Sequence, residues 1–508
     1  MYQIFFYFKT HLYASQRAPK ISCEHLKSPQ IPGAEVISLN STELKHYTVP
    51  AAPPFLGTPV VDLNVCAVNV ILQHPGAKDH VLVKVWMPLD NWNGRFQATG
   101  GSGYTAGLLD LTIGPSAKEG YSSASTDGGL SLNPISPEAW ALSEDGSLDQ
   151  DALRNFAYRS IHDMALVGKS LTEQFYGKKP DYSYWNGCST GGRQAVVAVQ
   201  NYPELFNGVL AGAPAINWDT YVVAEQWPQV VMHEENSFPS QCELRAFVDA
   251  AIAECDALDG VSDGIINDPD TCHFDPYSLV GRRITCDGCK TTITEPVARV
   301  IQKILQGPYD SMGRQIWFGL NVGAALDTLA NTTITSGHRI GNPFFVNDAW
   351  IRYFLVKNPG YDVASITYTE FQRLVNQSQT EYSNIIGTEQ ANLSAFKNAG
   401  GKLLMWHGTI DFRNRVERIM GGPAEVDDFF RLFLAPGVDH CAGNASLGAV
   451  PVDPLAALVG WVEEGIVPTE LAAKVSGSHS GNRPICPYPK TAQFVGGGNI
   501  SEHGFVCR

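Results

Sequence analysis

The chain has 508 residues, of which 44% are hydrophobic and 17% are charged, and this composition predicts a globular protein rather than a disordered one. At roughly 100–200 residues per domain, the length permits several domains or one large α/β fold with an insertion. The formal net charge is −15 and no lysine-rich or arginine-rich run occurs, which excludes nucleic acids and anionic membrane surfaces as partners. No stretch of about 18 apolar residues occurs, so no transmembrane helix is expected.

The cysteines and glycosylation sequons favour an oxidising, extracellular compartment. Several of the eleven cysteines stand close together in the sequence, as a disulfide framework requires. Asn-x-Ser/Thr sequons occur at Asn40, Asn331, Asn376, Asn392, Asn444 and Asn499. A secreted glycoprotein is therefore expected. Residues 1–20 contain an apolar run shorter than the roughly 7–15 residues of a signal peptide, so we expect a truncated leader or a gene-model artefact there.

Strands and helices alternate along the first part of the chain. Strands are predicted at 79–88, 182–186 and 208–211, and residues 93–98 lead into another strand that ends at the glycine-rich segment 100–103. Helices are predicted at 153–175 and 192–201. This order predicts an α/β fold with a mostly parallel sheet. The pattern breaks at 219–395, which reads as irregular, and a buried strand resumes at 402–406. We therefore expect a catalytic domain formed by 1–218 and 396–508, interrupted by a lid at 219–395 over the carboxyl ends of the strands.

A nucleophile motif lies between the predicted strand at 182–186 and the helix at 192–201. Gly187-Cys188-Ser189-Thr190-Gly191 fits G-x-S-x-G, in which a sharp strand-to-helix turn presents the serine hydroxyl above the sheet. The flanking glycines are needed because such a turn leaves no space for side chains. The motif predicts Ser189 as a nucleophile, with an ordinary tight turn as the alternative.

The general base is expected after the nucleophile and after the acid in chain order. His479 and His503 lie in a segment rich in glycine and serine, and His407 ends a buried strand, where a structural role is expected. His440 remains as the predicted base. Cys188 precedes Ser189 and Cys441 follows His440, so a disulfide between these cysteines would join two loops that the chemistry must bring together.

The other cysteines are expected to pair as Cys23 with Cys66, Cys255 with Cys272, Cys486 with Cys507 and Cys286 with Cys289. This pairing leaves Cys242 as the predicted free thiol.

These residues resemble the tannase and feruloyl esterase family of secreted hydrolases, whose hallmark is a Cys-Ser, Asp, His-Cys arrangement. The resemblance extends over most of the chain, at Trp92–Phe96, Ser125–Asp127, Gly187–Arg193, Ala211–Pro214, Trp406–Gly408 and Pro436–Cys441. It implies an α/β-hydrolase fold with a lid and cleavage of phenolic-acid esters such as ferulate or gallate, including feruloylated xylan. The rival substrate within this chemistry is a galloyl ester, and the rival from another class is an inactive, calcium-stabilised binding protein.

The family's acid follows a His-Gly-x-x-Asp pattern, and Asp411 satisfies this spacing after His407. Relatives continue with a longer, proline-containing loop before a helix that starts Gly-Thr-x-Asp. The segment Gly408–Asp411 aligns equally well with that helix start, in which case the acid loop is missing. Loss of a triad acid can lower the rate by roughly 10⁴-fold.

An acidic loop within the predicted lid suggests a calcium site. Carboxylates interleaved with carbonyls on a glycine-bent loop supply the oxygens that Ca²⁺ prefers, although the spacing differs from an EF-hand, and a solvated acidic turn is the alternative. The resemblance implies that Asp256, Asp259 and Asp263 and the carbonyls of Val261 and Ile265 hold a structural Ca²⁺ far from the chemistry.

The predicted reaction is two-step acyl transfer through Ser189 and His440. The tetrahedral oxyanion would be held by the amide of Thr190 and by a second amide near Gly101. Aromatic side chains of the lid would hold the phenolic ring.

Overall fold

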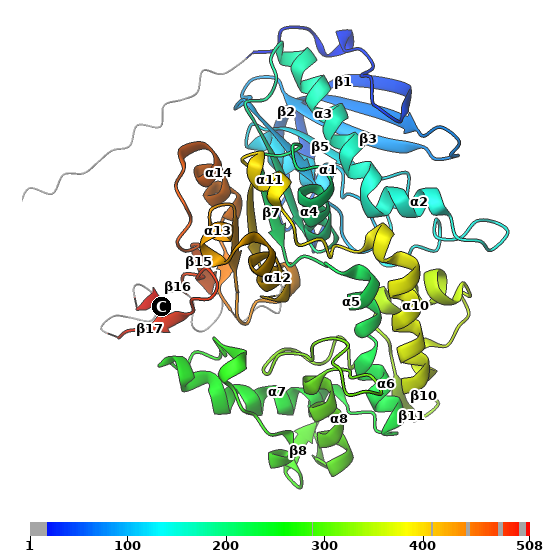
Figure 1. Cartoon of the computed structure of the whole chain (residues 1–508), viewed down its shortest axis with the longest axis vertical. Helices are drawn as coiled ribbons and strands as arrows, with labels where there is room; N and C mark the ends of the chain where they lie inside the picture. The colour runs from blue at the N-terminus through cyan, green and yellow to red at the C-terminus, as the bar shows by residue number, and fades with distance from the viewer. Residues whose placement is uncertain (1–17, 287, 408–409, 443–447, 476–480, 497–503) are drawn as a thin grey trace, which may run out of the picture.

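The computed structural model describes residues 18–286, 288–407, 410–442, 448–475, 481–496 and 504–508. Nine strands of this described chain form one twisted sheet in the order β1-β2-β3-β5-β4-β6-β7-β12-β13 (Figure 1). Their bounds are β1 Glu35–Val49, β2 Val60–Gln73, β3 Val81–Pro88, β4 Arg95–Thr99, β5 Ser122–Thr126, β6 Tyr182–Cys188, β7 Gly208–Gly212, β12 Lys402–Trp406 and β13 Phe430–Phe433.

The sheet is antiparallel at one edge and parallel through the rest. The β1/β2, β2/β3 and β3/β5 pairs are antiparallel, whereas the pairs from β5 across to β13 are parallel. The parallel strands are short and buried, as expected for strands covered on both faces. This is an α/β-hydrolase fold, and it places the carboxyl ends of β6, β7 and β12 next to one another.

Helices cover both faces of the sheet. One face packs against α3, α4 and α12, and the other against α1 and α14. Their bounds are α1 Asp110–Lys118, α3 Ser160–Tyr176, α4 Thr190–Asn201, α12 Ile410–Met420 and α14 Pro454–Glu464. None of the described helices is both long and apolar enough to cross a membrane.

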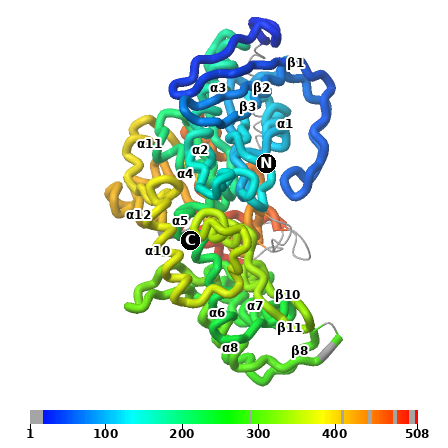
Figure 2. Tube along the Cα trace, turned by 90° about the vertical axis from the view of Figure 1, so that its right-hand side faces the viewer, coloured from blue at the N-terminus to red at the C-terminus, as the bar shows by residue number. Residues whose placement is uncertain are grey.

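The chain between β7 and β12 adds no described strand to the sheet and forms the lid below its carboxyl edge (Figures 1 and 2). The expectation that 219–395 is irregular is wrong, because this segment contains several helices. Their many polar residues obscured the helical spacing of the apolar residues in the sequence. Its helices are α5 Trp218–Ala224, α6 Trp227–Glu234, α7 Gln241–Cys255, α8 Glu295–Gln306, α9 Phe345–Ala349 and α10 Tyr368–Ile386. Its hairpins are β8 Arg283–Cys286 with β9 Cys289–Thr292 and β10 Thr332–Thr335 with β11 His338–Gly341. The next helix, α11 Ser394–Asn398, already packs in the core of the sheet domain (Figure 1).

The remaining elements are short. They are α2 Gln150–Arg154, α13 Pro423–Asp427, β14 Val450–Pro451, β15 Ala473–Val475, β16 Gly481–Asn482, β17 Ala492–Phe494 and β18 Phe505–Cys507. The predicted helix at 153–175 is interrupted by a π-helical turn at Asn155–Arg159. The carbonyls of Phe156 and Ala157 in this turn accept hydrogen bonds from the fully buried guanidinium of Arg193 on α4, at 2.9 Å each.

The lid and the sheet domain share an aromatic core. Tyr104 and Phe156 come from the sheet domain, Trp350 and Phe354 from the lid, and Trp218 opens α5 between them. Tyr104 lies 5.7 Å from Trp218 and 6.4 Å from Phe354 between ring centroids. The domain boundaries at 218/219 and 395/396 stay a prediction, since this core continues across the first of them.

The structure contains the four disulfides expected as Cys23–Cys66, Cys188–Cys441, Cys255–Cys272 and Cys486–Cys507. The expectation for the remaining cysteines is wrong, because a fifth disulfide joins Cys242 to Cys286. Cys286 and Cys289 face each other across the β8/β9 hairpin, and Cys242 on α7 reaches Cys286 from outside it. Cys289 is thus the eleventh cysteine, and its side chain lies outside the described residues.

Candidate active site

Ser189 occupies the sharp turn between β6 and α4. Its backbone angles are φ 61° and ψ −122°, a strained conformation for a residue with a side chain. The neighbouring glycines are required, since a Cβ on Gly187 would lie 2.5 Å from the Gly191 carbonyl oxygen, and one on Gly192 2.5 Å from that of Gly212. Ser189 itself stays partly exposed. The local sequence therefore places a reachable hydroxyl at the carboxyl edge of the sheet.

The glycine-rich turn after β4 lies directly beside Ser189. Gly191 N–H donates to the Gly101 carbonyl at 3.0 Å, and Thr190 Oγ1 donates to the Gly103 carbonyl at 2.6 Å. The N–H of Thr190 has no acceptor among the described residues, as an oxyanion donor requires. The Gly101 N–H, in contrast, donates to Gln194 Oε1 at 3.0 Å. The expectation for Gly101 does not fit the structure, because its amide is already occupied.

The Cys188–Cys441 disulfide brings the His440 loop to the nucleophile turn. The two cysteine Cα atoms lie 5.9 Å apart although 253 positions separate them in sequence. Ser189 and His440, the adjacent residues, therefore lie close together. No hydrogen bond joins their side chains within the described residues. Catalytic hydrogen bonds are often long without substrate and shorten in the complex.

His440 is held in a neutral form suited to a general base. Its backbone N–H donates to Asp439 Oδ1 at 2.8 Å. The residue is exposed to solvent, but desolvation by the surrounding protein and the nearby His407 lower its pKa. Burial likewise lowers the pKa of His407, which follows β12. Both imidazoles are thus uncharged near neutral pH.

The role of Asp411 stays a prediction, because its side chain lies outside the described residues. Its backbone is the second residue of α12, which begins at Ile410. Three residues, 407–409, therefore connect β12 to α12. Asp411 thus stands at the start of a helix, and whether it supplies the acid or an acid loop is missing stays a prediction.

The acidic loop lies at the contact between the lid and the C-terminal segment. Asp256 accepts backbone hydrogen bonds from Asp263, Gly264 and Ile265 at 3.0–3.2 Å. Arg483 donates to Asp263 and, at 2.9 Å, to Asp259. The loop is nearer to the chemistry than the sequence suggests, because a Cβ on Gly437, three residues before His440, would meet Ile265 Cγ2 at 3.3 Å.

The donor set of this loop fits a hard cation only in part. Burial raises the pKa of Asp259 and of Asp263, and Arg483 is the one cation that contacts them among the described residues, so the cluster has surplus negative charge. The carbonyls of Val261 and Ile265 accept no hydrogen bond within the described residues. Among the described residues, however, no group of three His, Cys, Asp or Glu side chains lies close enough together to hold a metal ion.

Sequence reasoning missed two residues of this region. Gln194 occupies the Gly101 amide and also donates to the Ala106 carbonyl at 2.9 Å, so it fixes the turn beside the nucleophile. Arg483 neutralises the acidic loop from 220 positions away in sequence. Gln194 is detectable in principle as a polar residue on the buried side of α4, whereas no local pattern distinguishes Arg483.

Comparisons with known proteins agree with this geometry. The family profile described as "Tannase and feruloyl esterase" matches residues 66–506. A "Probable feruloyl esterase" of Arthroderma benhamiae is 46% identical over 500 residues, covering 96% of this chain and 93% of that protein. Among solved structures, the tannin acyl hydrolase of Aspergillus niger superposes with a TM-score of 0.84 at 27% identity, covering 94% of this chain and 92% of the other. Feruloyl esterase B of Aspergillus oryzae gives 0.78 at 25% identity, covering 96% and 99%.

Proposed function

Because the chain belongs to the tannase and feruloyl esterase family of carboxylic ester hydrolases, we propose that it hydrolyses esters of phenolic acids with Ser189 as nucleophile and His440 as base. The observation that carries this proposal is the Cys188–Cys441 disulfide, which joins the turn of the nucleophile to the loop of the base.

In the proposed reaction His440 removes the Ser189 proton, and the alkoxide attacks the ester carbonyl to give a tetrahedral oxyanion. The Thr190 amide stabilises this oxyanion. The second donor in this proposal is the N–H of Gly103, in the glycine-rich turn after β4. This amide has no acceptor among the described residues. The tetrahedral intermediate then collapses and releases the alcohol, which takes the proton from His440. Water then hydrolyses the acyl-enzyme with His440 again as base.

Asp411 is the proposed acid that orients His440. If it acts, it does so from the first turn of α12. An inactive binding protein is the competing function, and the short connection between β12 and α12 is the observation that favours it. A fluorophosphonate separates the two, since an adduct at Ser189 requires an activated serine. Folded protein that forms no adduct would refute the esterase proposal.

The proposed acyl group is feruloyl, carried on plant cell-wall xylan, because a relative that is 46% identical over nearly the full chain is named a probable feruloyl esterase. A galloyl ester is the second candidate, and the TM-score of 0.84 with a tannin acyl hydrolase favours it. Steady-state rates on methyl ferulate and methyl gallate distinguish the candidates. A higher kcat/KM on methyl gallate would reverse the preference.

Calcium binding to the acidic loop is also proposed. Asp256, Asp259 and Asp263 with the carbonyls of Val261 and Ile265 would hold the ion, and the excess of these carboxylates over Arg483, the one cation that contacts them among the described residues, supports a missing positive charge. When bound, Ca²⁺ would neutralise the loop and stabilise it. Elemental analysis after dialysis against trace calcium tests this, and protein without calcium would contradict it.

Secretion is proposed from the covalent structure. The five disulfides in the described chain support this proposal, since such bonds form and persist in oxidising compartments. The sequon residues Asn40, Asn376 and Asn392 are exposed, as glycan attachment requires. Glycosidase treatment of protein from culture medium should reduce its apparent mass.

A further inference from the structure

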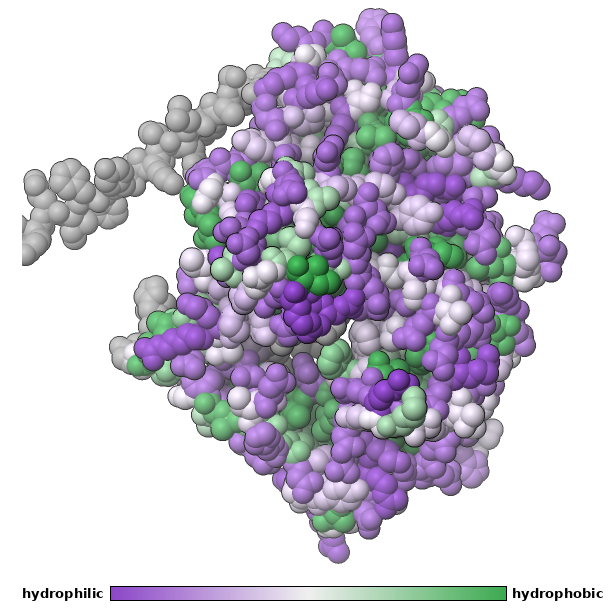
Figure 3. Space-filling view, in the orientation of Figure 1, coloured by the Kyte–Doolittle hydropathy of each residue, from purple (hydrophilic) through white to green (hydrophobic). Residues whose placement is uncertain are grey.

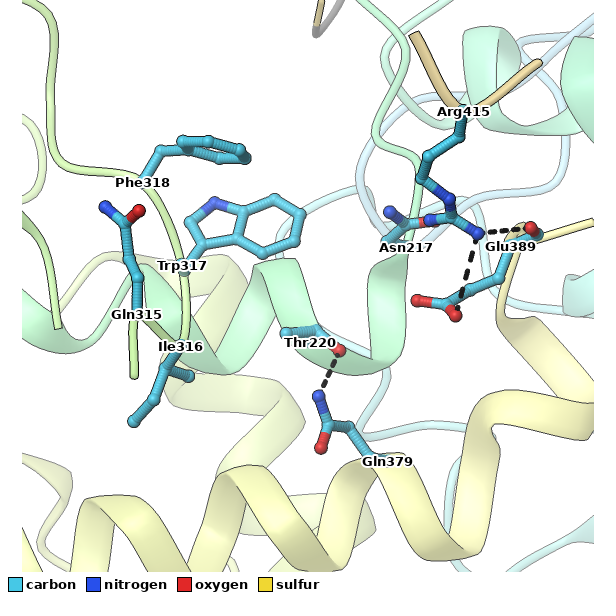
Figure 4. Close-up of a pocket in the computed structure, with 9 residues that line it drawn as sticks. All are labelled: Asn217, Thr220, Gln315, Ile316, Trp317, Phe318, Gln379, Glu389 and Arg415. Carbon is cyan, nitrogen blue, oxygen red and sulfur yellow. Dashed lines mark hydrogen bonds and ion pairs between the residues drawn. The ribbon is translucent and has the colours of Figure 1, made fainter. Parts of the chain in front are cut away.

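A cavity of about 230 Å³ lies between the sheet domain and the lid, on the face where the surface is hollowed (Figure 3). Asn217 and Thr220 of α5, Gln379 of α10 and Arg415 of α12 form one side. Trp317, from the connection between α8 and β10, lies across from Arg415 (Figure 4). Pockets for drug-sized ligands measure about 300–1,000 Å³, so this cavity suits a single ring rather than a whole aryl ester with its alcohol.

The cavity lies at the same sheet edge as the nucleophile. Ala215, two residues before Asn217, donates its N–H to the Ser189 carbonyl at 3.1 Å. Arg415 lies on α12, which follows β12, and β12 is separated from the strand of Ser189 by β7 alone in the sheet. The cavity therefore begins near the nucleophile turn at Asn217, and its Arg415–Glu389 side lies further along α4, where the residues on either side of Glu389 accept hydrogen bonds from Gln200.

The walls combine an aromatic face with polar groups that have unused hydrogen-bonding capacity. Trp317 is half-buried and packs against Tyr221, with 6.2 Å between ring centroids. Asn217 is 4% exposed, and its Nδ2 donates to no acceptor within the described residues. Gln379 uses its Nε2 to donate to Thr220 at 2.9 Å, which leaves its Oε1 without a donor in the described chain.

A charged pair, Arg415 with Glu389, completes the side of the cavity that faces Trp317 (Figure 4). Arg415 donates to the Glu389 carbonyl, and its Nη2 lies 3.8 Å from the Glu389 carboxylate. At 3.8 Å this ion pair is too long for a hydrogen bond, so both charged groups can still bind hydroxyl groups of a ligand. A buried, unpartnered amide beside a loose ion pair indicates a site for a ligand with several hydroxyls.

We infer that this cavity binds one sugar ring of the alcohol part of the ester, with Trp317 against the ring face and Asn217, Gln379 and the Arg415–Glu389 pair on its hydroxyls. The inference rests on the proposed function and specifies its leaving group. A ferulate ring carries one hydroxyl and one methoxy group, which would leave most of these polar groups unsatisfied. A galloyl ring carries three hydroxyls and is therefore the competing acyl occupant. A pentose or hexose presents hydroxyls around its rim and C–H groups on its faces, and such rings pack well on an indole.

The test measures binding and turnover separately, in the full chain. Binding of an arabinoxylo-oligosaccharide without ferulate is measured by calorimetry on Ser189→Ala, with and without Trp317→Ala or Asn217→Asp. Asn217→Asp keeps the side-chain oxygen and removes the Nδ2 donor. Turnover of methyl ferulate and of a feruloylated arabinoxylo-oligosaccharide is measured with Ser189 intact. Met312→Ala is the matched control, because Met312 lies on the same connection, is 69% exposed and does not line the cavity.

We expect Trp317→Ala to weaken oligosaccharide binding by about fivefold or more, since aromatic packing contributes about 0.5–1.5 kcal/mol beyond area burial. KM should rise similarly for the feruloylated oligosaccharide, with methyl ferulate unchanged. Equal losses on both esters would place the acyl group in the cavity and overturn the inference, as would unchanged oligosaccharide binding in both variants. If the protein hydrolyses neither ester, the proposed function fails, and the calorimetry still decides whether the cavity binds sugar.

Discussion

Removing the Cys188–Cys441 disulfide tests how the two proposed catalytic residues, Ser189 and His440, are brought together. The change is the double variant Cys188→Ala/Cys441→Ala, which keeps both backbones and removes the one covalent link between the nucleophile turn and the His440 loop. We expect a folded protein whose kcat on methyl ferulate falls by about 100-fold or more, because a displacement of about 1 Å in a reacting group can cost that much.

The expected stability loss follows from the loop that the disulfide closes. For 253 residues the chain-entropy relation gives about 5.5 kcal/mol. The Cys242–Cys286 disulfide lies inside this loop and shortens it by 44 positions, which lowers the value by about 0.2 kcal/mol. Measured effects are typically about 2–4 kcal/mol, so a loss in that range is expected in urea unfolding under non-reducing conditions.

Cys23→Ala/Cys66→Ala is the matched control. This disulfide closes a loop of 43 residues between the 3₁₀ turn Cys23–His25 and β2. The same relation gives about 4 kcal/mol for this loop. The control should lose stability and keep its kcat at a temperature where both variants are folded. If the Cys188–Cys441 variant also keeps the wild-type kcat while folded, the disulfide does not position His440 and the reasoning is refuted.

Three further outcomes follow from charges in the structure. Because the pKa of His440 is lowered, the acid limb of kcat/KM should have its midpoint below about 6.5, and a midpoint above that value would exclude His440 as the base in this environment. Burial opposes the charge of His74, but the hydrogen bonds that its ring donates to Asp163 and Asp79 outweigh burial and raise its pKa. Its stabilisation is therefore complete below about pH 6.5 and is lost as the pH rises through the higher folded pKa, so His74→Gln should lower the free energy of unfolding by about 3 kcal/mol at pH 5.5 and by less at pH 9. Equal losses at both values would show that His74 is not charged in the fold. Arg483→Gln leaves two buried carboxylates unpaired and should cost about 3 kcal/mol in EGTA, with partial recovery in calcium, whereas identical melting with and without calcium would contradict the proposed ion.

The sequence predicted the nucleophile turn because its constraints are local. Gly187 and Gly191 lie within two residues of Ser189, and the strand and helix on either side fix the turn that they form. The Cys188–Cys441 pairing was also accessible, since each cysteine is adjacent to a residue with an independent chemical argument. The sheet order around β6 follows from the same alternation of strands and helices.

What the sequence did not predict depends on contacts between distant segments. The Cys242–Cys286 disulfide requires α7 to pack against the β8/β9 hairpin, and short spacing in the sequence favoured Cys289 instead. The Gly101 amide was expected to be free, but the buried side chain of Gln194 reaches it across 93 positions. A glycine-rich motif indicates that the backbone makes a close contact. It does not indicate which polar atom accepts a hydrogen bond from that backbone.

The acidic loop gives the lid a structural connection to His440, the proposed base. Arg483 joins it to the C-terminal segment, Asn267 donates to the Ala492 carbonyl at 2.7 Å, and Ile265 packs against Gly437 of the His440 loop. Ser189 has no such dependence, because β6 lies inside the sheet between β4 and β7. Loosening the acidic loop should therefore displace the base and leave the nucleophile turn in place. An ion bound there would act on kcat through the position of His440, even though it never touches the substrate.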